Sequence, residues 1–228
     1  MKAKIIDEPS LRELIYVFDD RSQAGKLLSE KLKEYPHRED VLCLAIPAGG
    51  VPIGIEIAKR LSISLDIMIV RKIQIPWNTE AGFGALSYDG EVILNKPLMN
   101  SLALSEKAIE ASISKTKKDI KERIRKFREN KPMPELKSHT VILVDDGLAS
   151  GFTMLVAIKS VRKNHPKKII VAIPTASLGA LDLVSNAADE IVCLNIRSGP
   201  IFAVAEAYKN WFDLSEEEVI EILKNASD

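Results

Sequence analysis

Short, wholly apolar runs alternate along the chain with stretches whose apolar residues recur every three or four positions. The apolar runs are rich in Val and Ile and are typical of strands buried on both faces of a sheet; they span 41–46, 64–70, 141–144, 168–173 and 190–194. Helical spacing follows several of them, most clearly over 50–60 and 153–162. This alternation predicts an α/β fold with a doubly wound, mostly parallel sheet of about five strands flanked by helices.

The first forty residues add a helix and a weaker strand. Residues 14–18 form a short apolar run that favours a strand. Asp19 or Asp20 then offers the side chain of an N-cap for a helix over 21–33, and Pro36 ends that helix.

Residues 98–135 interrupt the alternation. Ser105 can cap a long helix over 105–131, in which isoleucines and Phe127 recur mostly at three- and four-residue steps. This stretch carries ten Lys or Arg against five Asp or Glu, so the outer face of the helix is basic. A solvated helix face explains that excess better than a membrane or nucleic-acid surface does. We expect an inserted helical segment that packs on the sheet or on a second subunit.

Two more segments flank the predicted sheet. Within 73–97, two extended runs surround Asp89-Gly90, a pair that favours tight hairpin turns. The tail, 196–228, is rich in aromatic residues in a chain with only 5% of them, and Ser215 with Glu218 has the pattern of a capping box. We expect the hairpin, the inserted helix and the tail to form a small hood on a single domain spanning 1–228.

The composition is that of an ordinary globular protein. Of 228 residues, 46% are hydrophobic, and 32 Lys+Arg balance 32 Asp+Glu, which gives no reason to expect nucleic acid as a partner. No apolar run approaches the roughly 20 residues that span a bilayer, and no signal-peptide pattern opens the sequence. Cys43 and Cys193 lie in apolar runs, which is typical of reduced core thiols. We expect a cytoplasmic protein with no membrane partner.

Candidate chemistry is concentrated in 141–153. Asp145 and Asp146 follow a buried strand directly, and a short loop containing Gly147 and Gly151 then leads into a helix. Such a loop turns backbone N–H groups toward one point, and the helix N-terminus adds partial positive charge, so the segment predicts a phosphate site. Two carboxylates beside a phosphate suit vicinal hydroxyls or a metal ion on the same ligand. The alternative is a buried strand whose acidic turn merely caps the helix.

The run Val-Ile-Leu-Val-Asp-Asp-Gly-Leu-Ala-Ser-Gly-Phe-Thr resembles the phosphoribosyl-pyrophosphate motif of type I phosphoribosyltransferases. The resemblance implies that Asp145 and Asp146 hold the ribose hydroxyls and the Mg²⁺ ion. It implies that the 5′-phosphate lies in the loop formed by Gly147, Leu148, Ala149, Ser150, Gly151, Phe152 and Thr153. Ser150 stands where many members have Thr.

A second glycine-rich turn follows the strand at 41–46. The spacing in Gly-Gly-Val-Pro-Ile-Gly does not fit the dinucleotide fingerprint Gly-x-Gly-x-x-Gly. Beside the first motif, it resembles the pyrophosphate loop of the family, which implies that Ala48, Gly49 and Gly50 contact the donor. Related members read Pro-Arg-Gly-Gly-Val-Pro, so Ala48 replaces an arginine that would make charge-assisted bonds to phosphate.

Arg71 and Lys72 follow the run 64–70. We expect both cations to face the crevice at the carboxyl ends of the strands. The pair resembles the one that meets pyrophosphate in the adenine and xanthine branches of the family. A solvated strand end is the alternative.

The resemblance also implies a mobile lid near residues 77–83 that excludes water from the donor. Glu80 in that lid is a candidate proton acceptor, although an exposed polar loop residue is the simpler explanation. Family members hold a purine by aromatic stacking, which makes Phe202, Tyr208 and Trp211 candidates, with packing of the tail as the alternative. Hypoxanthine–guanine members have an Asp at the position of Ala149.

Two functions follow from the resemblance. The first is an enzyme that transfers ribose 5-phosphate from phosphoribosyl pyrophosphate to a nitrogen of an unidentified base, with Mg²⁺ as cofactor. The second is a regulatory protein that binds the same donor, or a nucleotide, without transferring it. A dinucleotide-binding protein is a more distant third. Family members are usually dimers, so we expect a homodimer.

Overall fold

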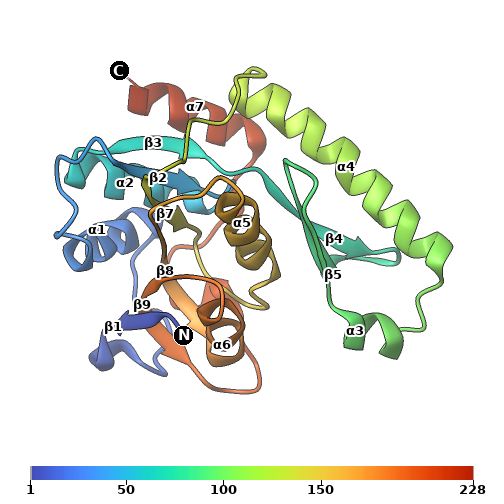
Figure 1. The fold of residues 1–228 in the computed structure, drawn as a ribbon. Coiled ribbons are helices and arrows are strands. Elements are labelled where there is room, and N and C mark those ends of the chain that lie inside the picture. The colour runs from blue at the N-terminus through green and yellow to red at the C-terminus, as the bar shows by residue number, and fades with distance from the viewer. Residues whose placement is uncertain (1, 228) are drawn as a thin grey trace.

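Six parallel strands form the main sheet of the computed structural model, which describes residues 2–227 apart from the side chains of Thr79, Glu80 and Ser227 (Figure 1). The strands lie in the order β1-β9-β8-β7-β2-β3. Their bounds are β1 Lys4–Asp7, β2 Val41–Ala45, β3 Ser64–Ile67, β7 Thr140–Val144, β8 Lys168–Ser177 and β9 Glu190–Arg197. The expected doubly wound parallel sheet is confirmed, with six strands rather than about five.

Helices cover both faces of this sheet. The helices of the described chain are α1 Arg21–Lys31, α2 Gly50–Leu61, α3 Lys96–Ser101, α4 Glu106–Arg128, α5 Phe152–Arg162, α6 Leu178–Ser185 and α7 Glu216–Ser227, with 3₁₀ turns at Pro9–Leu11 and Val204–Ala207. On β7, Val141 and Leu143 pack with α5 and α6, whereas Ile142 and Val144 pack with α1 and α2. Because successive strand residues point to opposite faces, burial on both faces requires the uninterrupted apolar run.

The N-terminal strand differs from the sequence expectation. Residues 14–18 make only an isolated bridge, from Phe18 to Tyr208, and the strand is Lys4–Asp7 at the sheet edge beside β9. An edge strand of four residues, two of them exposed, carries too little apolar pattern to stand out.

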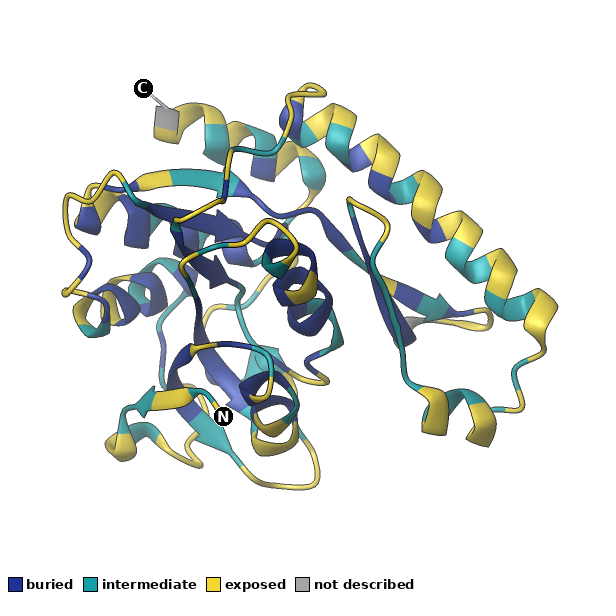
Figure 2. Cartoon of the chain, viewed as in Figure 1, coloured by how far each residue is buried: buried dark blue, intermediate teal, exposed yellow. Residues whose placement is uncertain are grey.

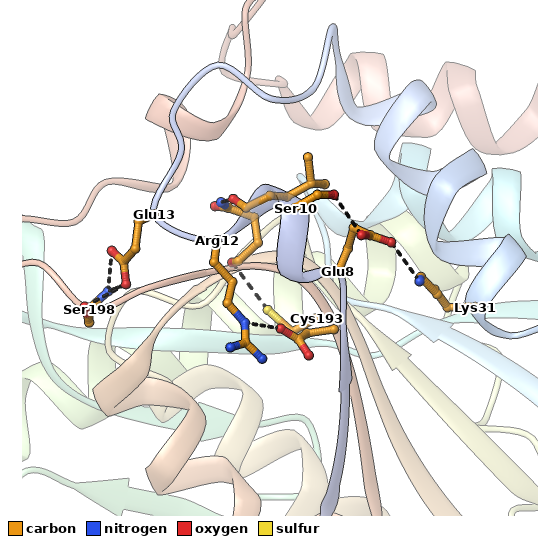
Figure 3. Close-up of polar contacts among 10 residues, drawn as sticks. Glu8, Ser10, Arg12, Glu13, Lys31, Cys193 and Ser198 are labelled. Carbon is orange, nitrogen blue, oxygen red and sulfur yellow. Dashed lines mark hydrogen bonds and ion pairs between the residues drawn. The ribbon is translucent and has the colours of Figure 1, made fainter.

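Polar contacts hold the following segment against the carboxyl end of β9 (Figure 3). The Glu13 carboxylate accepts hydrogen bonds from the backbone N–H and the hydroxyl of Ser198, and Glu8 pairs with Lys31 of α1 at 2.9 Å. The Asn195 side-chain amide donates to the carbonyl oxygens of Leu11 and Leu14. Residues 8–14 therefore close one side of the crevice above the sheet.

A second, antiparallel sheet forms the hood. It consists of β4 Val70–Ile75, β5 Asn78–Ser87 and β6 Val92–Leu94. The predicted hairpin is confirmed, with Gly90 in its turn at φ +87°. The expected strand over 64–70 instead ends at Ile67, and the chain re-enters extended structure at Val70 in the other sheet. A continuous apolar run gives no sign of this change of sheet.

The inserted helix α4 lies along the hood (Figure 1). The Ser105 hydroxyl caps it by accepting from the Ala108 N–H, as expected. Its Ile120 and Ile124 pack with Ile73 and Phe83 of the hood sheet, while its outer face is exposed (Figure 2). The segment thus packs on a sheet within the same chain.

The last helix and the cysteines follow their sequence patterns. Ser215 and Glu218 exchange the two hydrogen bonds of a capping box at the start of α7. Cys43 and Cys193 are buried free thiols. Within residues 2–227, no helix is long and apolar enough to cross a membrane.

Candidate active site

Asp145 and Asp146 lie at the carboxyl end of β7, in the middle of the sheet. Their carboxylates are partly exposed at the floor of the crevice, and the Asp146 N–H donates to Oδ1 of Asp145 at 2.9 Å. The Tyr208 hydroxyl donates to the Asp146 carbonyl oxygen at 2.6 Å. The aspartate pair is therefore fixed by the backbone of its own strand and by a side chain from the tail.

Arg21 is a site residue that the sequence analysis missed. Its Nε and Nη2 lie 3.0 and 2.9 Å from Oδ2 of Asp146, and its Nη1 donates to the Phe212 carbonyl oxygen at 2.8 Å. The guanidinium carbon also stands 4.0 Å from the ring centroid of Trp211. One signal was available: Arg21 opens α1, and a cation at a helix N-terminus is unfavourable unless an anion compensates it.

Burial and mutual repulsion act on the titration of both acids. Burial, reinforced by the neighbouring Asp146 carboxylate, raises the pKa of Asp145 well above its ordinary value. Burial also raises the pKa of Asp146, but the Arg21 guanidinium opposes that rise. The ion pair with Arg21 therefore favours the ionised form of Asp146, whereas Asp145 gains most from a further cation or a hydroxyl donor.

The loop after the acids is braced against β8. The Leu148 N–H donates to the Thr175 carbonyl, and the Ser177 N–H donates to the Leu148 carbonyl, both at 3.0 Å. Leu148 is buried, whereas Ala149 and Ser150 form the exposed tip. Gly151, at φ +77°, then precedes the eleven residues of α5, whose N-terminus points into the loop. The loop and the helix N-terminus thus have the local geometry on which the predicted phosphate site depends.

The Pro47–Gly50 turn stands directly beside the aspartates, because β2 and β7 are neighbours in the sheet. A Cβ atom on Gly49 would lie 1.8 Å from Oδ2 of Asp146, and one on Gly50 would lie 2.6 Å from the Val144 carbonyl oxygen. Only glycine permits this approach. The Pro47–Ala48 peptide bond is cis. The structure therefore brings together the two glycine-rich turns that the sequence singles out.

Arg71 and Lys72 open β4 of the hood instead of ending a strand of the main sheet. Successive strand residues point to opposite faces, so the two cations do not face one crevice together. Arg71 is half-buried, and it shares a strand face with Ile73, which packs with α4. Lys72 is exposed, and its side chain lies against Gly82.

The aromatic candidates of the tail divide into two groups. Tyr208 is only 1% exposed, and its ring packs between Phe18 and Trp211 while its hydroxyl holds Asp146. Tyr208 is therefore a core residue, and its expected availability for stacking was wrong. Phe202 lies 5.1 Å from the guanidinium of Arg197, the last residue of β9, whereas Trp211 packs on Arg21 and so lies beside the aspartate pair. The Glu80 side chain lies outside the described part of the structure.

Few side chains at the site could act as ligands of a metal ion. Among the described residues, no group of three or more His, Cys, Asp or Glu could hold a metal ion. Asp145 and Asp146 nevertheless fit Mg²⁺, because this ion keeps several waters and is usually bound through one or two carboxylates plus substrate phosphates. Such an ion would also offset the repulsion that raises the Asp145 pKa.

Comparison with known proteins places this site in a family. Residues 21–210 match the family model described as "Phosphoribosyl transferase domain", and the chain therefore belongs to the phosphoribosyltransferase family. Two Mycobacterium tuberculosis proteins, from strains H37Rv and CDC 1551, are each 33% identical over 210 residues and carry names that begin "Putative phosphoribosyl transferase". The match covers 92% of this chain but 47% of theirs, so the chain spans about half the length of these curated relatives.

Solved structures agree with this assignment. The protein TT1426 from Thermus thermophilus superposes with a TM-score of 0.72 and 32% identity, covering 91% of this chain and 98% of that one. AQ2163 from Aquifex aeolicus, at 13% identity, has a TM-score of 0.51 over 82% of this chain and 78% of its own, which shows a shared fold alone.

Proposed function

We propose that this protein transfers ribose 5-phosphate from phosphoribosyl pyrophosphate to a nitrogen of a nucleobase-like acceptor and releases Mg-pyrophosphate. The observation that carries the proposal is the contact between Gly49 and the Asp146 carboxylate. Because β2 and β7 are neighbouring strands, this contact sets two glycine-rich turns side by side. One is the phosphate loop after β7, which leads into the N-terminus of α5, and the other is the turn after β2. A ligand with phosphates on both sides of a ribose fits that arrangement.

In this proposal each end of the donor has its own residues. The loop Gly147–Thr153 binds the 5′-phosphate, Asp145 and Asp146 bind the ribose hydroxyls and Mg²⁺, and the turn at Ala48, Gly49 and Gly50 binds the pyrophosphate. The charge of Arg71 acts on Arg123, whose guanidinium contacts the Pro47 carbonyl of this turn, so Arg71 is the better placed of the two hood cations. Mg²⁺ supplies charge neutralisation of the leaving group when bound. The chain itself holds the reactants in line, which is the main catalytic contribution when charge separates between ribose and pyrophosphate.

The hood contributes the acceptor side. Trp77 lies at the tip between β4 and β5 and is 66% exposed. Such exposure suits a residue that becomes covered only when the hood closes over a bound ligand. Phe202 and Trp211 are the aromatic rings available to stack on a base, and Glu80 is the proposed proton acceptor in the lid. Closure would exclude water, which otherwise hydrolyses the donor.

The test is release of pyrophosphate from phosphoribosyl pyrophosphate and Mg²⁺ with a pooled panel of purine and pyrimidine bases. We expect base-dependent release that falls at least a hundredfold in Asp145→Asn and in Asp146→Asn, because each removes a carboxylate from the donor site. Dividing the pool identifies the acceptor. Release that is independent of both aspartates would contradict the proposal.

A second function, donor binding without transfer, is favoured by one observation. Arg21 already occupies Oδ2 of Asp146, and no charged side chain stands at Ala48 or at Ala149. A protein that senses the donor needs its binding site and no general base. Tight binding of phosphoribosyl pyrophosphate by calorimetry, with no release against any base, would favour this function over transfer.

A further inference from the structure

Ala48 has no cationic side chain, and the structure shows what packs beside it. Ala48 packs against a small apolar cluster that includes Val219 of α7, and Phe127 of α4 and Leu214 pack against the same cluster. Ala48 is half-buried on the side of the turn where the inserted helix and the last helix pack together.

The same helix brings an arginine to this turn. Arg123 is 9% exposed, and its Nη1 donates to the Pro47 carbonyl oxygen at 3.3 Å. Its Nε pairs with Oε1 of Glu216 in α7 at 3.0 Å, and its guanidinium carbon lies 5.6 Å from the Phe127 ring centroid. A buried guanidinium held from two sides has little freedom left to lose when it binds an anion.

A second guanidinium stands nearby on the hood. Burial, together with the charge of Arg71 at the start of β4, lowers the pKa of Arg123. Glu216 offsets one of the two guanidinium charges, and the partial positive charge of the α2 N-terminus at Gly50 adds to what remains, so a local excess of positive charge is left at the turn. An anion with two charged groups offsets that excess more effectively than a monoanion does.

We propose that Arg123 takes the place of the arginine missing at position 48 and binds the pyrophosphate group of the donor. This inference rests on the proposed function and deepens it, because it assigns the inserted helix α4 a part in the donor site. The guanidinium fork that contacts the Pro47 carbonyl donates to a phosphate oxygen seated on the Pro47–Gly50 turn. Arg71 flanks the same group from the hood sheet.

The experiment compares two ligands that differ only in the pyrophosphate. Phosphoribosyl pyrophosphate and ribose 5-phosphate are titrated with Mg²⁺ into wild type, Arg123→Met and Arg123→Lys by calorimetry. We expect Arg123→Met to weaken binding of the first ligand at least tenfold and binding of ribose 5-phosphate less than twofold. Arg123→Lys keeps the charge but not the fork, so we expect a smaller loss.

Lys126 provides the matched control. It pairs with the other oxygen of Glu216 at 2.7 Å from the same helix, but it is 39% exposed. Lys126→Ala should leave both affinities unchanged. Thermal melting shows whether Arg123→Met is folded; if it is not, Arg123→Lys decides, and equal affinities to wild type would overturn the assignment.

The outcomes separate this inference from the proposed function. Equal losses for both ligands, or no loss for either, would overturn the role of Arg123 while wild-type binding of the donor still supports the family function. A wild-type protein that binds neither ligand would overturn both.

Discussion

Asp146 is held by residues from three distant parts of the chain. Arg21 pairs with its carboxylate, the Tyr208 hydroxyl holds its carbonyl oxygen, and Gly49 lies against the carboxylate with no side chain between. Because each contact fixes a different part of the residue, a bound ribose meets a carboxylate that is already oriented. Preorganisation of this kind lowers the cost of binding.

Gly49 gives a direct test of this contact. Its φ of −62° is open to any residue, so Gly49→Ala strains no backbone, but the new Cβ would displace the Asp146 carboxylate. We expect affinity for phosphoribosyl pyrophosphate to fall at least tenfold, as measured by calorimetry. Gly179→Ala is the control, since a Cβ at Gly179 meets nothing within 4 Å. Unchanged affinity in Gly49→Ala would mean that the carboxylate does not touch the donor.

Asp145 makes stability depend on pH. The pKa of Asp145 in the folded chain lies above its ordinary value of 3.8. At pH values between the two, the folded chain binds more protons than the unfolded chain, so the free energy of unfolding falls as the pH rises. Asn at this position carries no charge. We therefore expect Asp145→Asn to increase the free energy of unfolding at pH 7 by about 1 kcal/mol.

Urea unfolding at two pH values checks this expectation. The gain of Asp145→Asn over wild type should shrink toward zero as the pH falls below 3.8, because the carboxyl group is then protonated in both states. A gain that is the same at both pH values would show that the variant acts through packing and not through charge.

At the scale of elements, the apolar periodicity of α4 predicts the helix but not the surface on which it packs. The spacing of its isoleucines predicts a helix over 105–131, and the structure has Glu106–Arg128. The pattern also predicts a buried face, but it does not say which surface covers that face. The surface is the hood sheet, and its apolar side is itself built from residues near Ile73 and Phe83.

Arg128 anchors the end of this helix to the main sheet. It pairs with both oxygens of Asp66 and donates to the carbonyl oxygens of Ile67 and Pro132. Arg128→Met would leave a half-buried carboxylate and these carbonyls without their donor. We expect a loss of about 3 kcal/mol in the free energy of unfolding, measured with urea.

Arg125 is the control for this prediction. It lies on the exposed face of the same helix, three residues earlier, and surface substitutions away from buried contacts change stability by about 0.5 kcal/mol or less. Comparable losses in Arg125→Met and Arg128→Met would show that helix charge, and not the Asp66 anchor, is responsible.

On the scale of the whole molecule, hood and sheet are joined by shared packing. Phe127 of α4 packs in one cluster with Ala45 of β2 and Val219 of α7, and Arg123 links α4 to α7 through Glu216. We therefore expect a single cooperative unfolding transition for the proposed single domain of 1–228, in which Trp77 and Trp211 report from the hood and the crevice. Tryptophan fluorescence and far-UV circular dichroism should give coincident curves.

Ligand binding provides the second half of this prediction. Phosphoribosyl pyrophosphate with Mg²⁺, at a hundred times its dissociation constant, should raise the free energy of unfolding by about 2.7 kcal/mol without splitting the transition. Two separate transitions would mean that the hood folds independently of the sheet. The homodimer that family resemblance suggests is tested in the same samples by sedimentation.

The sequence by itself determined the sheet, most of its helices and the two glycine-rich turns. These features are local: a buried strand needs a continuous apolar run, and a phosphate loop needs its acids and glycines within about a dozen consecutive residues. Both turns follow strands of a parallel sheet, so both lie at its carboxyl ends, but only the folded chain makes β2 and β7 neighbours. The sequence missed the edge strand Lys4–Asp7 because its apolar pattern is weak. It also predicted one strand over 64–70, because the apolar run continues where the chain in fact passes from β3 to β4.

Only the tertiary structure decided which side chains complete the site. Arg21 and Asp146 are 125 residues apart, and Arg123 reaches Pro47 across 76. Arg21 sits at an unfavourable helix position, and Arg123 is one of ten cations on a helix that reads as solvated, so neither pattern names a partner. Their contacts arise because packing α1 and α4 buries each guanidinium next to polar partners from distant parts of the chain, and that geometry exists only in the folded protein.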